Sequence, residues 1–342
     1  MLDDLKMIHE RDAQDALGIA EKQWQQLAHE FDVPELHFTP EYIVFSGMGG
    51  SALAARLALT WPGFSIPFTI SSSYSIPGFT SEKTLFIASS YSGNTEETLE
   101  SVRLAESKNA QIVIISAGGS LVEIAKAKGY PYILLPRVSQ PRYATLYSFK
   151  ALITYLEKVH LLDSAQANRE LSGAVDMLKT STTQWRPDVA CKQNYAKQIA
   201  LELIGKSIVV YGGPLTYPAA YKWKISFNEN AKNVAWCNEY PEFNHNEFLG
   251  WTSHPVEKPY AVVDLRSSFE HPRIQKRFDL SAKLLSGRRP TPQTVEAQGD
   301  TVLEQLLWLV ALGDFVSIYV ALLNGLNPTP VELIEKFKKE LA

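Results

Sequence analysis

The sequence predicts an α/β fold of two domains, each a mainly parallel sheet covered by helices on both faces. Short continuous apolar runs alternate with segments of helical length, a pattern typical of buried parallel strands. The length of 342 residues exceeds what one hydrophobic core usually supports. Residues 43–50 and 208–213 are also similar, since each is an apolar run that ends in glycines. We therefore expect two domains of one kind, each a three-layer αβα sandwich.

The first half of the chain accounts for one such domain. Residues 4–29 have the pattern of a leading helix. Strands are expected at residues 42–45, 68–70, 85–88, 111–115 and 132–135, and helices at residues 51–59, 95–108 and 121–128. With its leading helix, this domain is predicted to cover residues 1–165.

The second half repeats the alternation after a helical stretch at residues 144–203. Strands are expected at residues 207–211, 234–236 and 260–264, with a helix at residues 219–228. The second domain is predicted at residues 185–342, and residues 165–185 form a helical connection. Residues 288–292 have the composition of an exposed loop.

One apolar segment, residues 302–326, is long enough to be considered as a membrane-spanning helix. Polar residues interrupt it, namely Glu304, Gln305, Asp314 and Asn324. Charged residues are costly at the centre of a bilayer, so a helix buried between protein layers is favoured. We expect no membrane association from this segment.

Composition sets mild limits on function. The net charge of -4 gives no reason to expect nucleic acid or an anionic membrane as a partner. Cys191 and Cys237 are the only cysteines, too few for a disulfide framework or a cysteine zinc site. The first residues lack the apolar core of a signal peptide. A cytoplasmic location is expected.

The segment most informative about function follows the expected strand at residues 85–88. Ser90, Ser92 and Thr95 provide three short hydroxyl groups around Gly93, directly before an expected helix. Gly93 allows a tight turn, and the first N–H groups of the helix would point at the same place. One such residue alone would be read as a helix cap. Three hydroxyls with a glycine indicate an anion site, and phosphate is the anion we expect.

A glycine-rich turn at residues 47–52 fits the pattern G-x-G-x-x-A of dinucleotide sites. A nicotinamide site would also have an acidic residue about 20 positions later. Residues 70–74 contain none. A turn that lines a sugar-phosphate pocket, with Ser51 facing the ligand, is favoured, and a purely structural turn remains the alternative.

Proton-transfer chemistry is suggested by two clusters in the second half. Glu229 lies between two asparagines at the end of an expected helix, and His245 lies among polar residues at 241–247. A carboxylate and an imidazole suit acid–base catalysis, although either residue alone would usually be a surface group. His245 with Glu242, Glu247 or His254 could instead ligate a metal, but no helical i, i+4 ligand spacing supports this.

In combination these motifs resemble the bifunctional phosphoglucose/phosphomannose isomerases, which are built from two sugar-isomerase (SIS) domains. The resemblance covers nearly the whole chain. It rests on residues 47–51, 90–95, 141–142, 228–230, 244–247 and 328–330, followed by Lys336. It implies two SIS domains and interconversion of glucose 6-phosphate and mannose 6-phosphate with fructose 6-phosphate through a cis-enediolate, with neither cofactor nor metal.

The resemblance also implies roles for individual residues. Glu229 matches the base that moves a proton between C1 and C2, and Arg142 matches the cation placed against the enediolate. His245 and Lys336 match the residues linked to ring opening, with the histidine supplied by the partner subunit of a homodimer. Thr329 matches a threonine associated with acceptance of both C2 epimers. Substrate contacts are implied for Gly49, Gly50, Ser51, Ser90, Ser92 and Thr95.

Two departures from the family pattern concern substrate preference. The serine at 51 is followed by Ala52-Leu53 without the extra glycine often found there, and Asn327 replaces a common aspartate. Two alternatives remain open. One is a sugar-phosphate sensor without activity. The other is an aminosugar-phosphate enzyme, although no early cysteine suggests a glutaminase domain.

Overall fold

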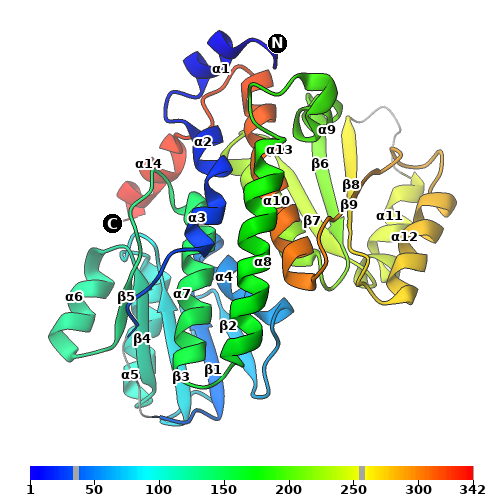
Figure 1. Cartoon of the computed structure of the whole chain (residues 1–342). Coiled ribbons are helices and arrows are strands. Elements are labelled where there is room, and N and C mark those ends of the chain that lie inside the picture. The colour runs from blue at the N-terminus through cyan, green and yellow to red at the C-terminus, as the bar shows by residue number, and fades with distance from the viewer. Residues whose placement is uncertain (34–37, 254–258, 342) are drawn as a thin grey trace. The chain divides into compact units, whose positions relative to one another are not determined.

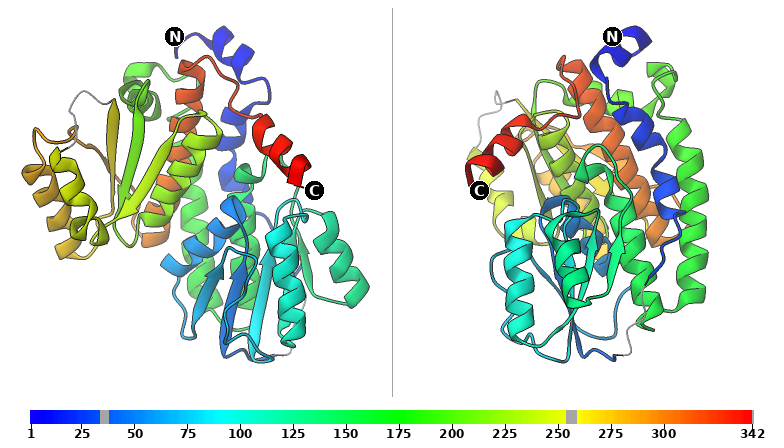
Figure 2. Two further views of the ribbon diagram at one scale, coloured as in Figure 1. Left: turned by 180° about the vertical axis from the view of Figure 1, so that it is seen from behind. Right: turned by 90° about the vertical axis from the view of Figure 1, so that its left-hand side faces the viewer.

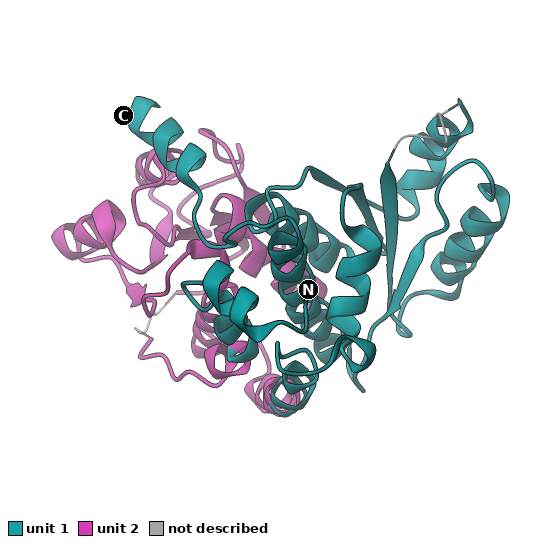
Figure 3. Cartoon of the chain, turned by 90° about the horizontal axis from the view of Figure 1, so that it is seen from above, with its two compact units in different colours: residues 1–22, 176–342 teal, residues 23–175 magenta. Residues whose placement is uncertain are grey.

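The computed structural model describes residues 1–33, 38–253 and 259–341, and contains two parallel β-sheets with helices around them (Figure 1). The predicted α/β class is confirmed. The chain divides into two compact units (Figure 3). Unit 1 comprises Met1–Lys22 and Asp176–Ala342, and unit 2 comprises Gln23–Val175.

Unit 2 is built on a five-stranded sheet of order β2-β1-β3-β4-β5, parallel throughout. The strands are β1 Tyr42–Ser46, β2 Phe68–Ser71, β3 Thr84–Ser89, β4 Gln111–Ser116 and β5 Tyr132–Leu134. Its helices are α3 Gln23–Leu27, α4 Gly49–Thr60, α5 Glu96–Ser107, α6 Gly119–Lys128, η1 Pro141–Tyr143 and α7 Thr145–Lys158, while α8 Ser164–Thr183 continues into unit 1.

Both faces of this sheet are buried, as its continuous apolar strands predict. Val44, Phe86 and Ile114 belong to one core cluster with residues of α5 and α6. The alternate residues Phe45 and Ile87 are equally buried, because α4 and α7 cover the other face (Figure 2). The carboxyl ends of the strands, and the loops that follow them, are therefore the part of the sheet left open to a ligand.

Unit 1 contains a four-stranded parallel sheet of order β7-β6-β8-β9. Its strands are β6 Ser207–Gly212, β7 Ala235–Glu239, β8 Tyr260–Arg266 and β9 Gln293–Glu296. Its helices are α1 Leu5–Arg11, α2 Ala16–Glu21, η2 Cys191–Gln193, α9 Tyr195–Leu203, α10 Tyr217–Glu229, η3 Glu242–His245, α11 Glu247–Gly250, η4 Trp251–Ser253, α12 Pro272–Leu284, α13 Val302–Leu323 and α14 Glu332–Leu341. The order matches that of β2-β1-β3-β4 in unit 2, so the similarity between the two halves is structural as well.

The single leading helix expected at residues 4–29 is instead three short helices. The first helix ends at Arg11, and the Asp12 carboxylate then accepts hydrogen bonds from Ala16 N and Leu17 N, at 2.8 and 2.9 Å, at the start of α2. Asp15 then adopts a left-handed conformation and caps α2. The first two helices pack with unit 1, where Arg11 donates to Leu322 O. The predicted domain bounds had placed them with the first sheet.

The apolar segment near the C-terminus forms α13, and the prediction of a buried helix is confirmed. This helix is long and apolar enough to cross a membrane by composition, but 94% of its most hydrophobic window is buried within the protein. It packs against α10, α9 and α2.

Within the expected exposed loop at residues 288–292, Arg288 and Thr291 are exposed as predicted, and Arg289 is the exception. Arg289 is only 6% exposed, and its guanidinium lies 5.5 Å from the ring centroids of both Tyr211 and Phe243. The aromatic rings account for the burial, because a guanidinium stacks favourably on them. Asp264, also buried, is a second charged group whose field reaches Arg289.

Candidate functional site

The hydroxyl groups predicted to bind an anion converge at the carboxyl ends of β1 and β3 in unit 2. The Oγ of Ser90 lies 2.7 Å from Thr95 Oγ1 and 3.4 Å from Ser92 Oγ. Ser51, in the first turn of α4, accepts a hydrogen bond from Tyr91 N at 3.2 Å. Three hydroxyls from the loop after β3 and one from α4 thus lie close together, and Ser92 at the edge is exposed.

The backbone of this loop depends on Gly93. Its φ of +71° lies in the left-handed region, and a Cβ there would lie 1.7 Å from Gly118 O. No other residue fits this position. Gly93 N and Asn94 N donate to Ser90 Oγ and Ser92 Oγ, so the tight turn also orients the hydroxyls.

The glycine-rich loop adds the start of α4 to the cluster. Gly49 has a φ of +50°, and a Cβ at Gly50 would lie 3.6 Å from Arg142 Cα. Met48, at the N-cap, makes no side-chain hydrogen bond to α4. The 12-residue helix thus presents its N-terminus, with a positive partial charge, beside the backbone of Arg142.

Arg142 itself is 2% exposed and lies on η1. Its guanidinium lies 4.7 Å from the centroid of the Tyr143 ring, and its carbonyl accepts from Thr145 Oγ1. A buried guanidinium keeps its positive charge at any physiological pH. Unit 2 therefore brings together the predicted residues Gly49, Gly50, Ser51, Ser90, Ser92, Thr95 and Arg142.

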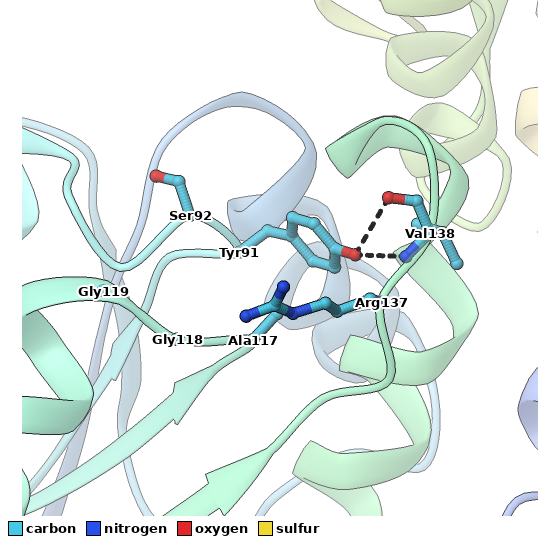
Figure 4. A pocket seen from close by; sticks show the side chains of 7 residues that line it. All are labelled: Tyr91, Ser92, Ala117, Gly118, Gly119, Arg137 and Val138. Carbon is cyan, nitrogen blue, oxygen red and sulfur yellow. Dashed lines mark hydrogen bonds between the residues drawn. The ribbon is translucent and has the colours of Figure 1, made fainter.

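A cavity of about 230 Å³ adjoins the hydroxyl loop (Figure 4). Its lining includes Tyr91, Ser92 and Arg137, and the Tyr91 hydroxyl is held by hydrogen bonds with Val138. Arg137 was missed by the sequence reasoning. The available signal was its position, since it is the first cation after the strand β5 and so falls at the carboxyl edge of the sheet.

In unit 1, Glu229 is the last residue of α10 and is half-buried. Both of its neighbours anchor the helix end. The Asn228 amide donates to Ala235 O and accepts from Ala235 N, which ties α10 to the start of β7. Asn230 Nδ2 donates to Ser317 Oγ on α13 at 2.9 Å. The Asn-Glu-Asn motif therefore fixes the backbone on both sides of the carboxylate.

The body of α10 is joined to α13 by a buried polar cluster. Lys222 Nζ forms an ion pair with Asp314 and donates to Ser226 Oγ at 2.9 Å, and Ser226 in turn donates to Asp314 at 2.8 Å. Buried charges are tolerated when they are paired and hydrogen-bonded in this way. Lys222, Ser226 and Asn230 recur every four residues and so lie on one face of α10.

The remaining predicted site residues lie on other elements of unit 1. Thr329 follows α13 and is 4% exposed. His245 is the last residue of η3, and Lys336 lies on α14; both are exposed. Among the polar residues near His245, Glu247 has a structural role, because it accepts hydrogen bonds from Tyr211 and Asn238.

A metal site near His245 gains no support from this geometry. Within residues 1–33, 38–253 and 259–341, no group of three or more His, Cys, Asp or Glu side chains is placed to hold an ion. Glu242 is engaged by Asn246 Nδ2 at 2.7 Å. His254, a possible ligand in the sequence prediction, lies outside the described residues.

The second sheet has a loop in the position equivalent to the hydroxyl loop, and this loop carries a buried carboxylate. After β8, which corresponds to β3, Glu270 accepts a hydrogen bond from Leu215 N at 2.7 Å, just before α10. Burial raises the pKa of Glu270, while the N–H groups of Leu215 and Thr216 act to lower it. A Cβ at Gly213 would lie 2.4 Å from this carboxylate.

Comparison with known proteins agrees with this geometry. Residues 192–341 match the family model of the bacterial phospho-glucose isomerase C-terminal SIS domain. A bifunctional phosphoglucose/phosphomannose isomerase of Caldicellulosiruptor bescii is 34% identical over 304 residues, covering 88% of this chain and 89% of that protein. An Aquifex aeolicus protein of the same name is 32% identical, covering 93% and 94%. The chain belongs to this isomerase family.

This chain is also similar to an epimerase and to solved structures. A D-glucosamine-6-phosphate 4-epimerase of Sulfolobus acidocaldarius is 33% identical over 243 residues, covering 71% of this chain and 74% of the epimerase. Among solved structures, a glucose-6-phosphate isomerase like protein of Thermus thermophilus superposes with a TM-score of 0.69 at 18% identity, covering 99% and 98% of the two chains. At that identity the match shows the SIS fold alone, and it confirms the prediction of two SIS-type domains.

Proposed function

We propose that this protein interconverts glucose 6-phosphate and mannose 6-phosphate with fructose 6-phosphate. The observation that carries the proposal is Glu229, a half-buried carboxylate whose two flanking asparagines anchor it, in a chain of the phosphoglucose/phosphomannose isomerase family. Aldose–ketose isomerisation moves one proton between adjacent carbons, so one well-placed base can serve both C1 and C2.

The hydroxyl cluster in unit 2 suits the substrate phosphate. Ser51, Ser90, Ser92 and Thr95 offer donors of short reach, and the N-terminus of α4, which has no side-chain cap, adds backbone N–H groups. The phosphate is remote from the reacting carbons. Its binding energy can therefore hold the open chain in a reactive geometry without entering the chemical step.

In the proposed mechanism Glu229 removes the C2 proton of an aldose and returns it to C1. The electrons pass through a cis-enediolate, whose negative charge needs a fixed cation. Arg142 has the permanent charge and the buried, pre-set position that such stabilisation demands. Mannose 6-phosphate differs from glucose 6-phosphate only at C2, the carbon that becomes planar, so a base able to reach either face would serve both.

His245 and Lys336 are proposed to open the sugar ring, and the active enzyme is proposed to be a homodimer. His245 is exposed on η3 within its own chain, which suits a residue that serves the active site of a partner subunit. Thr329, almost fully buried, is proposed to shape the pocket so that both C2 epimers fit.

A second candidate function comes from the epimerase relative. That protein is named for a change at C4 of an aminosugar phosphate, and its identity to this chain is close to that of the isomerases. Both activities start from a hexose 6-phosphate, so the hydroxyl cluster suits either one. The isomerase and the epimerase differ in which carbon of the sugar lies next to the catalytic base.

A coupled assay of purified, EDTA-treated protein tests the proposal. Glucose 6-phosphate, mannose 6-phosphate, fructose 6-phosphate and glucosamine 6-phosphate are supplied separately, and products are identified by chromatography. Interconversion of the first three is expected. Turnover of glucosamine 6-phosphate alone would replace the proposal with the epimerase, and saturable binding of all four without turnover would indicate a sensor.

A further inference from the structure

One side chain joins the segment that contains Glu229 to the segment that contains Thr329. Lys232 lies three residues beyond Glu229, and its ammonium donates hydrogen bonds to three backbone carbonyls. They are Asn230 O at 3.2 Å, Asn327 O at 2.9 Å and Pro328 O at 3.1 Å. An ammonium has three N–H donors, so this set matches its capacity.

The backbone at Lys232 is shaped for this contact. Its φ of +50° lies in the left-handed region, which is uncommon for a residue with a long side chain. The chain reverses there, and Asn233 N donates back to Phe227 O at 3.1 Å. Because of this reversal, Lys232 stays close to the end of α10.

The Thr329 segment has few backbone donors of its own. Pro328 and Pro330 flank Thr329 and have no N–H to donate. Thr329 N donates to Asn327 Oδ1 at 3.0 Å, and Asn327 Nδ2 donates to Gln14 Oε1 at 2.8 Å. Lys232 contacts the two carbonyls immediately before Thr329, so it connects this segment directly to the end of α10.

We propose that Lys232 is a positioning residue: it sets the place of Thr329 relative to Glu229 and so helps to decide which C2 epimer is processed. This inference rests on the proposed function. A lysine that only stabilised a helix terminus would contact carbonyls of that helix. Two of the three carbonyls here belong to the Thr329 segment, which a helix cap would not require.

The test replaces Lys232 with Met, which keeps the aliphatic stem and removes the ammonium. Lys232 is exposed as a residue, so the variant should fold. We expect the ratio of kcat/KM for mannose 6-phosphate to that for glucose 6-phosphate to change by about tenfold, because small displacements near a reacting carbon have large effects. Lys232→Arg, which retains the charge and N–H donors, should move the ratio back toward the wild-type value.

Lys197, which is fully buried whereas Lys232 is exposed, provides a control for the loss of lysine–carbonyl hydrogen bonds elsewhere in unit 1. Its ammonium also contacts backbone carbonyls in unit 1, Pro187 O and Val189 O, both at 2.8 Å, together with the Asp3 carboxylate. Lys197→Met should lower the melting temperature and leave the epimer ratio unchanged. If the ratio changes equally in both variants, or in neither, Lys232 has no positioning role.

Hydrogen exchange separates failure of this inference from failure of the proposed function. The amides of Asn327, Thr329 and Val331 should exchange faster in Lys232→Met than in the wild type, whatever the enzyme's activity. Unchanged exchange would refute the connection even in an active enzyme. Faster exchange in a protein that converts neither sugar would retain the connection and reject the isomerase.

Discussion

Glu229 depends on its neighbours for the properties that its proposed role needs. The side chains of Asn228 and Asn230 form hydrogen bonds with β7 and α13. The backbone position from which the Glu229 side chain extends is therefore fixed. A glutamate at a frayed helix end would lose conformational entropy each time it approached a substrate. The two asparagines hold the backbone on either side of Glu229, so the backbone part of that cost is met before a substrate binds.

Replacing Glu229 with Gln tests the assigned base. The amide preserves shape but cannot accept a proton, so kcat should fall by at least ~10²-fold, the lower bound for general acid–base catalysis. Fructose 6-phosphate binding, measured by calorimetry, should persist. Glu202→Gln is the control, since Glu202 is an exposed glutamate near the end of α9 in the same unit. Full activity in Glu229→Gln would remove the residue from the mechanism.

Asp264 predicts a pH dependence of stability. Burial raises its pKa from 3.8 to about 6, against the opposing fields of Arg289 and Arg266. The folded state therefore holds this proton more tightly than the unfolded state. The contribution of this proton to the free energy of unfolding is fully present below pH 4, and it is lost as the pH rises through about 6.

The substitution Asp264→Asn should reduce the pH dependence of the free energy of unfolding. Between pH 5 and 7.5, the free energy of unfolding should decline by roughly 1 kcal/mol less in the variant than in the wild type. Urea titrations at several pH values, compared as differences, measure it. Identical slopes would mean that Asp264 stays ionised in the folded protein throughout this range.

At the level of elements, the packing of α10 on α13 determines where Glu229 lies. Trp223 Nε1 donates to Leu309 O at 2.7 Å, and the indole occupies the space that a side chain at Gly313 would fill. The Lys222–Asp314 pair lies beside it. The two helices are therefore held by close shape complementarity as well as by charge.

Gly313→Ala should disturb this packing. The new methyl group would lie 2.3 Å from the Trp223 ring, so the free energy of unfolding should fall by about 1–3 kcal/mol, the usual effect of overpacking. Gly250→Ala is the matched control, because a Cβ there meets nothing within 4 Å. Equal stability of the two variants, measured by thermal unfolding, would show that α10 can move away from α13 at little cost.

The sequence predicted the regular elements well wherever burial is continuous. The runs that became β1, β3, β4, β6 and β8 are apolar because both sheet faces are covered. The hydroxyl loop was also predictable, since Ser90, Ser92 and Thr95 lie close together in sequence and share one turn. Glu229 at a helix end followed from the pattern of α10.

What escaped prediction depends on contacts between distant residues. The strand β9 is short and mostly polar, and only its pairing with β8 defines it. Arg289 reads as a loop residue because the rings that bury it lie about 80 and 45 positions away in sequence. The hydrogen bonds of Lys232 to Asn327 and Pro328 likewise leave no local pattern.

At the scale of the whole molecule, the groups proposed for one reaction are divided between the units. Unit 2 has the hydroxyl cluster and Arg142, while unit 1 has Glu229, His245, Thr329 and Lys336. Neither unit alone contains both the proposed phosphate site and the proposed base. Activity should therefore require the full chain, and the proposed dimer adds His245 from a second copy.

Complementation tests that dimer. Glu229→Gln and His245→Ala chains are expected to be impaired when separate. If His245 serves the partner's site, unfolding and refolding them together should restore roughly a quarter of wild-type activity, because half of the dimers are mixed and each has one intact site. Activity of the mixture no greater than the mean of the separate variants would place His245 in the site of its own chain.

The carboxylate of Glu270 has a consequence for how the two sheets came to differ. Both halves share a strand order and a loop poised above a helix start, yet in one half that place is taken by a side chain of the protein itself. A duplicated fold would otherwise offer two phosphate sites. Under the proposed function, Glu270 occupies one of these places from within, which leaves a single phosphate site per chain and lets the second sheet serve as the support of Glu229.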